Sequence, residues 1–359
     1  MQAHGYVLYE DRPEAAVGAA LALVSLLRSE PGAQVRLHVP PDWTELRAWA
    51  GGFPGVTLAE KMPAGVKGWS VKPFLLEAAL ADGGWRRVTW IDSDFVFLKG
   101  PGARLAALAD DVLAVAQEPC LQPRQGTRWR AEAWGLEAGK EWGFTVNSCL
   151  VSVTSRHAGL LADWKAAVEA EAFRDAQALP ILRRPAHLWS DQDALGALLG
   201  SKRYEALAVF VFRSGADIVH AGGLTFYSLK ERWRTLTGPG PVVVHAIADK
   251  PWKVLARGGV AGGTFFWRLM ALVQETGPYV YQARRYAGGL PMAAPWSKVF
   301  IRAERLATSR PVPKVRKSRM WMPMSPRTPF EPCAADRRQS QRSSVRQSPQ
   351  CRPVSQLCR

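Results

Sequence analysis

The fold is decided by the stretch Arg87-Val88-Thr89-Trp90-Ile91-Asp92-Ser93-Asp94-Phe95-Val96-Phe97-Leu98, in which an apolar run carries two carboxylates one residue apart. Near-continuous apolar sequence of this length is typical of a buried strand in a parallel sheet. If the strand tip stays extended, Asp92 and Asp94 point to the same face, about 6–7 Å apart at Cα, and they repel each other unless a cation lies between them. Oxygen-rich sites of this kind suit Mg²⁺ or Mn²⁺. The alternative is that Asp92 caps the next turn and Asp94 is solvated.

Strand and helix patterns alternate on both sides of this stretch. Strands are predicted at residues 6–9, 36–39, 56–58, 113–116, 144–153, 207–212, 218–220 and 242–245. Helices are predicted at residues 14–28, 43–50, 74–80, 157–172, 191–199 and 264–276, and residues 117–142 read as a long, polar, Trp-rich loop. The alternation predicts an α/β fold with a Rossmann-like, mostly parallel mixed sheet flanked by helices. Ligands of such sheets bind outside the carboxyl ends of the strands, where Asp92 and Asp94 are expected.

The chain divides into three parts by composition and charge. Residues 1–255 are expected to form a catalytic domain, residues 256–310 a helical extension and residues 311–359 a basic, disordered tail. Residues 301–359 hold 14 Lys+Arg and 3 Asp+Glu, a net +11 of the total +16, which leaves +5 for residues 1–300. The tail can therefore attract an anionic membrane surface or hold the chain near an anionic lipid-linked acceptor. A shifted reading frame at the 3′ end of a GC-rich gene is the other explanation of its composition.

The sequence gives no sign of a membrane-spanning or secreted protein. No apolar run approaches 18 residues, and the N-terminus has no basic region followed by an apolar one. The expected location is the cytoplasm, with peripheral attachment to the inner face of the membrane through the tail as an option. The five cysteines form no C-x-x-C pair, which argues against a zinc site and against a disulfide framework.

Four polar motifs follow one another along the chain. They are Asp92-Ser93-Asp94, Asn147-Ser148, Asp191-Gln192-Asp193 and the segment from His245 to Lys250-Pro251-Trp252. In this order they resemble the GT-A nucleotide-sugar-dependent glycosyltransferases, and among these the family that includes glycogenin and the bacterial lipopolysaccharide galactosyl- and glucosyltransferases. The resemblance covers about residues 5–255.

The resemblance implies a metal site. In that family the Asp-x-Asp pair, here Asp92 and Asp94, binds Mn²⁺, and a later histidine, here His245, is the third protein ligand. Two carboxylates and one imidazole suit Mn²⁺, with Mg²⁺ as the other ion to expect. His220, which also ends an apolar run, is the competing third ligand. The alternative interpretation of His245 is an ordinary histidine at the end of a strand, with no metal to bind.

The resemblance also implies residues that bind the donor. Lys250 matches the family's lysine that contacts the nucleotide diphosphate, although its spacing from His245 is one residue shorter and the usual glycine between them is missing. Asn147 and Lys72 match residues that face the donor. The alternative for Lys72 is a solvated lysine at a helix start, and the alternative for the Lys-Pro-Trp segment is a plain surface turn. Asp11, at the end of the first strand, either approaches the nucleoside or caps the following helix.

Asp191 and Gln192 match the segment that faces the donor sugar and the reacting carbon, and they are the expected catalytic residues. The alternative is a helix N-terminus, capped by Ser190, at which acidic residues are favoured by the helix dipole. The tryptophans in and beside the 117–142 loop either hold an acceptor sugar or anchor the loop.

The resemblance therefore implies a metal-dependent glycosyltransferase. It would transfer a hexose from a nucleoside-diphosphate sugar, chiefly a UDP-sugar, to a glycan or lipid-linked acceptor in bacterial surface polysaccharide synthesis, with retention of anomeric configuration. Two other classes are compatible with the residues: a metal-dependent nucleotidyltransferase, and a nucleic-acid-binding protein that acts through the basic tail. No Gly-rich phosphate loop near the N-terminus favours the former, and no specific nucleic-acid partner is expected.

Overall fold

The structure is a computed structural model, and it describes residues 2–60, 62, 65–119, 126–222, 240–247, 250–252, 277–286 and 290. Contacts divide the chain into two units, Met1–Pro311 and Val312–Arg359, and every described residue belongs to the first unit. The predicted helix at 264–276 and the predicted tail at 311–359 lie outside the described residues. Most of the predicted extension at 256–310 does so too, apart from a short helix, α12 (Pro278–Ala283), and its neighbours.

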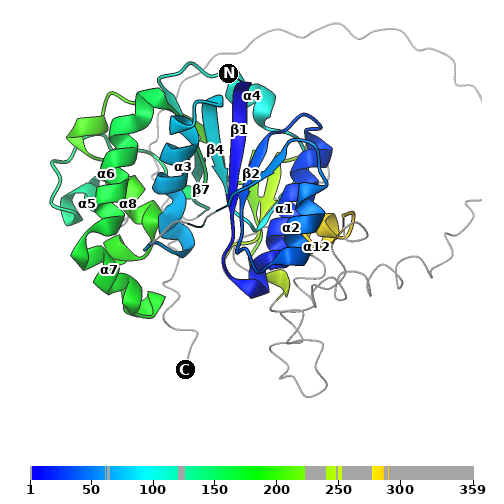
Figure 1. Cartoon of the computed structure of the whole chain (residues 1–359). Helices are drawn as coiled ribbons and strands as arrows, with labels where there is room; N and C mark the ends of the chain where they lie inside the picture. Colours follow the sequence, from blue (N-terminus) through cyan, green and yellow to red (C-terminus); the bar gives the residue numbers. More distant parts are fainter. Residues whose placement is uncertain are drawn as a thin grey trace, which may run out of the picture. The chain divides into compact units, whose positions relative to one another are not determined.

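A seven-stranded sheet in the order β3-β2-β1-β4-β7-β6-β8 forms the centre of this unit (Figure 1). The strands are β1 (Gln2–Tyr9), β2 (Val35–His38), β3 (Val56–Leu58), β4 (Trp85–Ile91), β6 (Val112–Gln117), β7 (Val146–Thr154) and β8 (Ala208–Phe212). β7 runs antiparallel to both of its neighbours, and the other neighbouring strands are parallel. The predicted mostly parallel mixed sheet is confirmed.

Because β7 is antiparallel, its amino end lies at the edge where its neighbours have their carboxyl ends. Asn147, near the start of β7, pairs with Ala116 near the end of β6, and Leu150 pairs with Ile91 at the end of β4. The residues that follow β4 and β6 therefore meet the first residues of β7. We call this the functional edge of the sheet.

Helices cover both faces of the sheet (Figure 1). They are α1 (Ala16–Ser29), α2 (Thr44–Gly51), α3 (Lys72–Ala81), α4 (Gly102–Ala106), α5 (Thr127–Ala133), α6 (Ala158–Glu169), α7 (Glu171–Ala178) and α8 (Asp191–Leu199). Short 3₁₀ turns join them: η1 (Pro13–Ala15), η2 (Gly68–Val71), η4 (Ser155–His157), η5 (Ile181–Arg183), η6 (Ala186–Leu188) and η7 (Lys202–Tyr204). Side chains alternate along β1, so Tyr6 and Leu8 share a core with α1 and α2, whereas Val7 and Tyr9 share a core with α3, α6 and α8.

A second, three-stranded sheet carries the late strands. It consists of β5 (Phe95–Phe97), β10 (Val243–His245) and β9 (Ile218–His220), in the order β5-β10-β9. β10 is antiparallel to β5 and parallel to β9, which sets His245 opposite Phe95 on one side and His220 on the other. Asp94 immediately precedes Phe95, and its carbonyl accepts a 3.0 Å hydrogen bond from the N–H of Ala246. Strand pairing thus brings a histidine to the Asp-x-Asp turn.

The structure differs from the sequence predictions at three points. The predicted loop 117–142 contains α5, a seven-residue helix too short to show a clear apolar period. The predicted helix at 157–172 ends at Glu169, and α7 follows it. Asp11 does not cap a helix, since Arg12 and Ala15 occupy the N-cap positions of η1 and α1. No helix among the described residues is both long enough and apolar enough to cross a membrane.

Candidate functional site

Asp92 and Asp94 lie in the turn between β4 and β5. The N–H of Asp92 donates to the carbonyl of Cys149 over 2.9 Å, which extends the pairing of β4 with β7 by one residue. The side chain of Asp92 is 25% exposed, whereas that of Asp94 is buried. The alternative of a solvated Asp94 is therefore excluded.

The structure brings Asp92, Asp94 and His245 together. One ligand atom from each side chain lies within 4.8 Å of the other two. Asp94 Oδ1 is 3.2 Å from His245 Nε2, and this buried oxygen accepts no hydrogen bond from the described residues. A buried carboxylate oxygen that accepts no hydrogen bond is unfavourable, and a cation bound between this oxygen and the imidazole nitrogen would compensate for its burial. Two carboxylates and one imidazole fit Mn²⁺ or Mg²⁺.

Lys250 supplies a positive charge to the same carboxylate. Its ammonium donates to Asp94 Oδ2 and, over 2.8 Å, to the carbonyl of Ala246. Burial alone would raise the pKa of Asp94, but interactions led by the ammonium of Lys250 outweigh burial and hold this pKa well below its usual range. Asp94 is therefore ionised at neutral pH, as a metal ligand must be.

Trp252 fixes the turn that carries Lys250. The indole is fully buried and packs against α1 at Gly18, where an added Cβ would lie 2.6 Å from indole Cη2 and 2.8 Å from the carbonyl oxygen of Ser93. Because Gly18 has no side chain, the Lys-Pro-Trp turn and the Asp-x-Asp turn can both approach the same helix. The Lys-Pro-Trp segment is therefore packed into the core and is not a plain surface turn.

We expect Gly18→Ala to lower the free energy of unfolding by about 1–3 kcal/mol through overpacking, although Gly→Ala inside a helix normally gains up to about 1 kcal/mol. Urea unfolding followed by circular dichroism measures the change. The matched control is Gly159→Ala in α6, where the nearest atom to an added Cβ is Tyr204 Oη at 4.0 Å. Equal stability of the two variants would contradict the packing role of Gly18.

Lys72 begins α3 and joins two carboxylates. Its ammonium lies 3.2 Å from Asp92 Oδ1 and 3.5 Å from Asp191 Oδ2, and it donates to Ser148 Oγ over 2.8 Å. Burial alone would lower the pKa of Lys72, but Asp191 and Asp92 outweigh it and raise the pKa above its ordinary value. The lysine is therefore a buried, permanently charged link between the metal-side carboxylate and α8.

Asp191, the first residue of α8, is buried beside Lys72. Burial raises the pKa of Asp191 to about 6, against the opposing effect of Lys72. Lys72 offsets only part of the effect of burial, and the negative charges of Asp92 and Asp193 raise the pKa further. Asp191 Oδ2 accepts no hydrogen bond from the described residues, so it can receive a ligand's positive charge or donor.

Asp193, in contrast, serves the helix. Its Oδ2 accepts hydrogen bonds from the N–H and the hydroxyl of Ser190, both over 3.0 Å, and its Oδ1 accepts one from Arg130 Nε over 3.0 Å. Ser190 is the N-cap of α8, as predicted. The helix-start alternative therefore describes Asp193 but does not account for Asp191.

Glu118 is a carboxylate of the site that no motif in the sequence indicated. Its Oε2 accepts hydrogen bonds from Asn147 Nδ2 over 2.6 Å and from Gln192 Nε2 over 3.3 Å. Burial raises the pKa of Glu118, and the bond from Asn147 opposes this shift. Glu118 follows β6 as Asp92 follows β4, and this place after a strand was the available signal. It orients the two amides predicted to face the donor.

Asp11 lies at the end of β1 and faces η2. Its Oδ2 accepts a 3.3 Å hydrogen bond from the N–H of Gly68, whereas its buried Oδ1 accepts none from the described residues. That oxygen can accept a hydrogen bond from a ligand. The neighbouring Glu10 is already bound by the guanidinium of Arg12 and by the hydroxyl of Ser93.

His220, the competing third ligand, lies behind His245. Its Nδ1 is 3.0 Å from His245 Nδ1, and its Nε2 is 3.0 Å from the carbonyl oxygen of Gln117. Burial and the nearby His245 lower the pKa of His220 to about 3. With both ring nitrogens engaged, His220 has no nitrogen left for a metal ion.

Two tryptophans of the 117–142 loop, Trp134 and Trp142, act as anchors. Trp134 Nε1 donates to the carbonyl of His187 over 3.0 Å, and Trp142 Nε1 donates to the carbonyl of Leu199 over 2.9 Å. These bonds fix the loop to η6 and α8. The anchoring interpretation therefore applies to both indoles.

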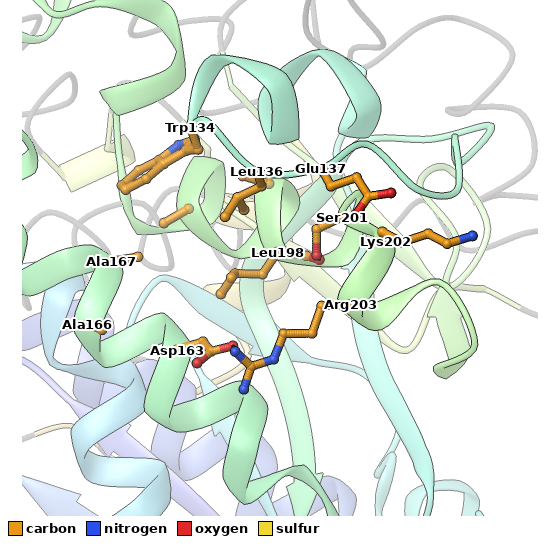
Figure 2. Close-up of a pocket in the computed structure, with 12 residues that line it drawn as sticks. Trp134, Leu136, Glu137, Asp163, Ala166, Ala167, Leu198, Ser201, Lys202 and Arg203 are labelled. Carbon is orange, nitrogen blue, oxygen red and sulfur yellow. Dashed lines mark hydrogen bonds and ion pairs between the residues drawn. The ribbon is translucent and has the colours of Figure 1, made fainter.

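A cavity of about 520 Å³ lies between α6 and α8, and Trp134 is one of the residues that line it (Figure 2). Ala167 and Leu198 line it, and Asp163 and Arg203 form a 3.0 Å ion pair at one side. None of the carboxylates and lysines at the functional edge lines this cavity. The charged side chains that could carry chemistry therefore lie at the functional edge and not in this cavity.

No family model matches the sequence, and the search of curated proteins gave no match. The chain is similar to solved glycosyltransferase structures. The apo structure of the bifunctional glycosyltransferase WbbM is 14% identical, with a TM-score of 0.45 over 79% of this chain and 51% of that chain. An active-site mutant of LgtC is 15% identical, with a TM-score of 0.42 over 80% of this chain and 100% of that chain. GlyE of Streptococcus pneumoniae TIGR4 is 14% identical, with a TM-score of 0.40 over 80% of this chain and 64% of that chain. The chain thus spans about half the length of WbbM.

Proposed function

We propose that this protein is a metal-dependent glycosyltransferase that transfers a hexose from a nucleoside-diphosphate sugar. The main support is that Asp92, Asp94 and His245 meet at the functional edge of the sheet. Two lysines, Lys72 and Lys250, lie beside them. A site of this kind suits an anionic ligand that arrives with a divalent ion. Uridine is the base we propose, because relatives in the family it resembles mostly use UDP-sugars.

The leaving group is stabilised from the side of Asp94. In sugar transfer the bond between the anomeric carbon and the phosphate breaks, and its electron pair leaves with the diphosphate. Mn²⁺ or Mg²⁺ held by Asp92, Asp94 and His245 would supply Lewis-acid stabilisation of that charge. Lys250 supplies a second positive charge, since its flexible, partly exposed side chain can turn from Asp94 to a phosphate oxygen.

The sugar is held from the side of α8. As the leaving group departs, positive charge grows on the sugar ring, and the carboxylate of Asp191 can stabilise it. The amides of Asn147 and Gln192 are oriented by Glu118 and can bind sugar hydroxyls. We propose that the reaction retains the anomeric configuration, as the resemblance implies.

The acceptor is proposed from the resemblance and from the tail. A glycan or lipid-linked acceptor of bacterial surface polysaccharide synthesis would lie at the cytoplasmic face of the membrane. The basic residues of 311–359 can hold the enzyme there. Liposome association that is unchanged after deletion of residues 311–359 would refute this part of the proposal.

Titration of the full-length protein with UDP, with and without Mn²⁺, tests the proposed function. We expect binding that requires Mn²⁺ and is lost in the Asp92→Asn variant, with ADP and GDP as competing nucleotides. UDP released from UDP-glucose or UDP-galactose then identifies sugar transfer or hydrolysis, whereas pyrophosphate release would identify a nucleotidyltransferase. A folded protein that binds UDP in neither condition would refute the proposal.

The raised pKa of Asp191 predicts an acid limb in the pH profile. Protonation below about pH 6 removes the negative charge that the sugar needs, so kcat/KM should fall about tenfold per pH unit below that value. Steady-state rates between pH 5 and 8 measure it. The Asp191→Asn variant should be slower at pH 8 and should lose this limb. A wild-type profile that is flat from pH 5 to 7 would contradict the role of Asp191.

A further inference from the structure

His220 lies beside His245, on the neighbouring strand, and has no role in the proposed chemistry. His220 and His245 end the parallel strands β9 and β10 and stand opposite each other in register. Both side chains are buried, at 1% and 4% exposure. Their Nδ1 atoms are 3.0 Å apart, and His220 Nε2 is 3.0 Å from the carbonyl oxygen of Gln117. These contacts form a chain that runs from the backbone carbonyl of Gln117 through the rings of His220 and His245 to Asp94.

The proton positions along this chain of contacts follow from the acceptor at one end of it, the carbonyl of Gln117. The Gln117 carbonyl can only accept, so His220 Nε2 must carry a proton. A neutral His220 then has a bare Nδ1, and burial among apolar strands favours the neutral ring over the charged one. One proton bridges the two Nδ1 atoms, and it belongs to His245. A neutral His245 with its proton on Nδ1 presents the Nε2 lone pair.

The Nε2 lone pair of His245 faces the carboxylate of Asp94. His245 Nε2 lies 3.2 Å from Asp94 Oδ1, which accepts no hydrogen bond from the described residues. Without His220, a neutral His245 could place its proton on Nε2 and donate it to Asp94. This alternative tautomer would occupy the lone pair and the carboxylate oxygen that a metal ion needs. The neighbour of His245 on the other strand, Phe95, offers no acceptor to prevent it.

We propose that His220 is a positioning residue that fixes His245 in the Nδ1–H tautomer and thereby aims its Nε2 lone pair at a divalent cation. The proposal rests on the metal site of the proposed function, and it concerns a residue outside that ligand set. Partners that hold a metal-bound histidine through its second nitrogen typically change metal affinity by 10–100-fold when removed. The carbonyl of Gln117 belongs to the backbone of β6, so this chain of contacts also ties the tautomer to the main sheet.

Metal binding to the full-length protein tests the proposal without any turnover. Mn²⁺ affinity is measured by electron paramagnetic resonance for the wild type, His220→Leu and His220→Asn. We expect His220→Leu to bind Mn²⁺ about 10–100-fold more weakly. His220→Asn keeps an acceptor oxygen close to the position of Nδ1 and should bind within a few-fold of the wild type. If His220→Leu binds as tightly as the wild type, or if His220→Asn loses as much as His220→Leu, the proposal is overturned.

Proton positions give a second readout that does not depend on a variant folding. In the wild type with diamagnetic Mg²⁺, long-range ¹H–¹⁵N spectra should show His245 protonated on Nδ1 and His220 on Nε2. A proton on Nδ1 of His220 would overturn the proposal. If the wild-type protein binds UDP but no divalent ion, the proposed role of His220 is overturned, whereas the proposed binding of a nucleotide is not. Metal binding with unchanged His220 variants overturns this proposal and leaves the proposed function intact.

Discussion

Replacing Asp94 by asparagine should abolish Mn²⁺-dependent UDP binding and lower sugar transfer by at least about 10³-fold. The reason is that Asp94 accepts from the ammonium of Lys250 and offers its unpaired Oδ1, beside His245 Nε2, to the proposed metal ion. Metal ions stabilise developing charge by several kcal/mol, and about 4 kcal/mol corresponds to a factor of 10³ in rate. Calorimetric titration with UDP and Mn²⁺, followed by UDP release from a UDP-sugar, measures both losses.

The control for this substitution is Asp82→Asn. Asp82 is 58% exposed and pairs with Arg36. It precedes the amino end of β4, the end away from the functional edge, so its loss should change neither binding nor rate measurably. Circular dichroism must show that both variants are folded. If Asp94→Asn kept Mn²⁺-dependent UDP binding within a few-fold of the wild type, the assignment of Asp94 as a ligand would be wrong.

Replacing Lys72 by methionine should lower the free energy of unfolding at pH 8 by about 3–5 kcal/mol, because the change leaves Asp191 buried without its cation. Asp191 already has a pKa of about 6, above its ordinary value of 3.8, and loss of Lys72 should raise this pKa further. In that case the folded state binds more protons than the unfolded state above pH 4, so stability falls as the pH rises. The loss should therefore be smaller at pH 5 than at pH 8.

Urea unfolding at the two pH values measures the effect of Lys72→Met. Lys165→Met is the matched control, since Lys165 pairs with Glu77 at the surface and should contribute only about 0–1 kcal/mol. The double variant Lys72→Met/Asp191→Asn should recover part of the loss, because it removes the uncompensated charge as well. A Lys72→Met protein as stable as the Lys165→Met protein would show that the buried carboxylates do not depend on this lysine.

Several parts of the site could be predicted from the sequence because they depend on local order. An apolar strand followed by Asp-x-Asp places Asp92 and Asp94 at the end of a parallel strand, and β4 ends at Ile91. Ser190 before an acidic helix start predicts the first turn of α8, which begins at Asp191. The alternation of strands and helices predicts the layered α/β fold, which the structure confirms.

Local patterns in the sequence thus predict the fold class, the strand that carries the two aspartates and the start of α8. Which side chains meet depends on the pairing of distant elements, because periodicity shows which face of an element is buried but not which elements pair. The antiparallel β7 brings Asn147 to Glu118, and the pairing of β10 with β5 and β9 places His245 between Asp94 and His220. Such contacts join residues far apart in the chain, so no local pattern records them.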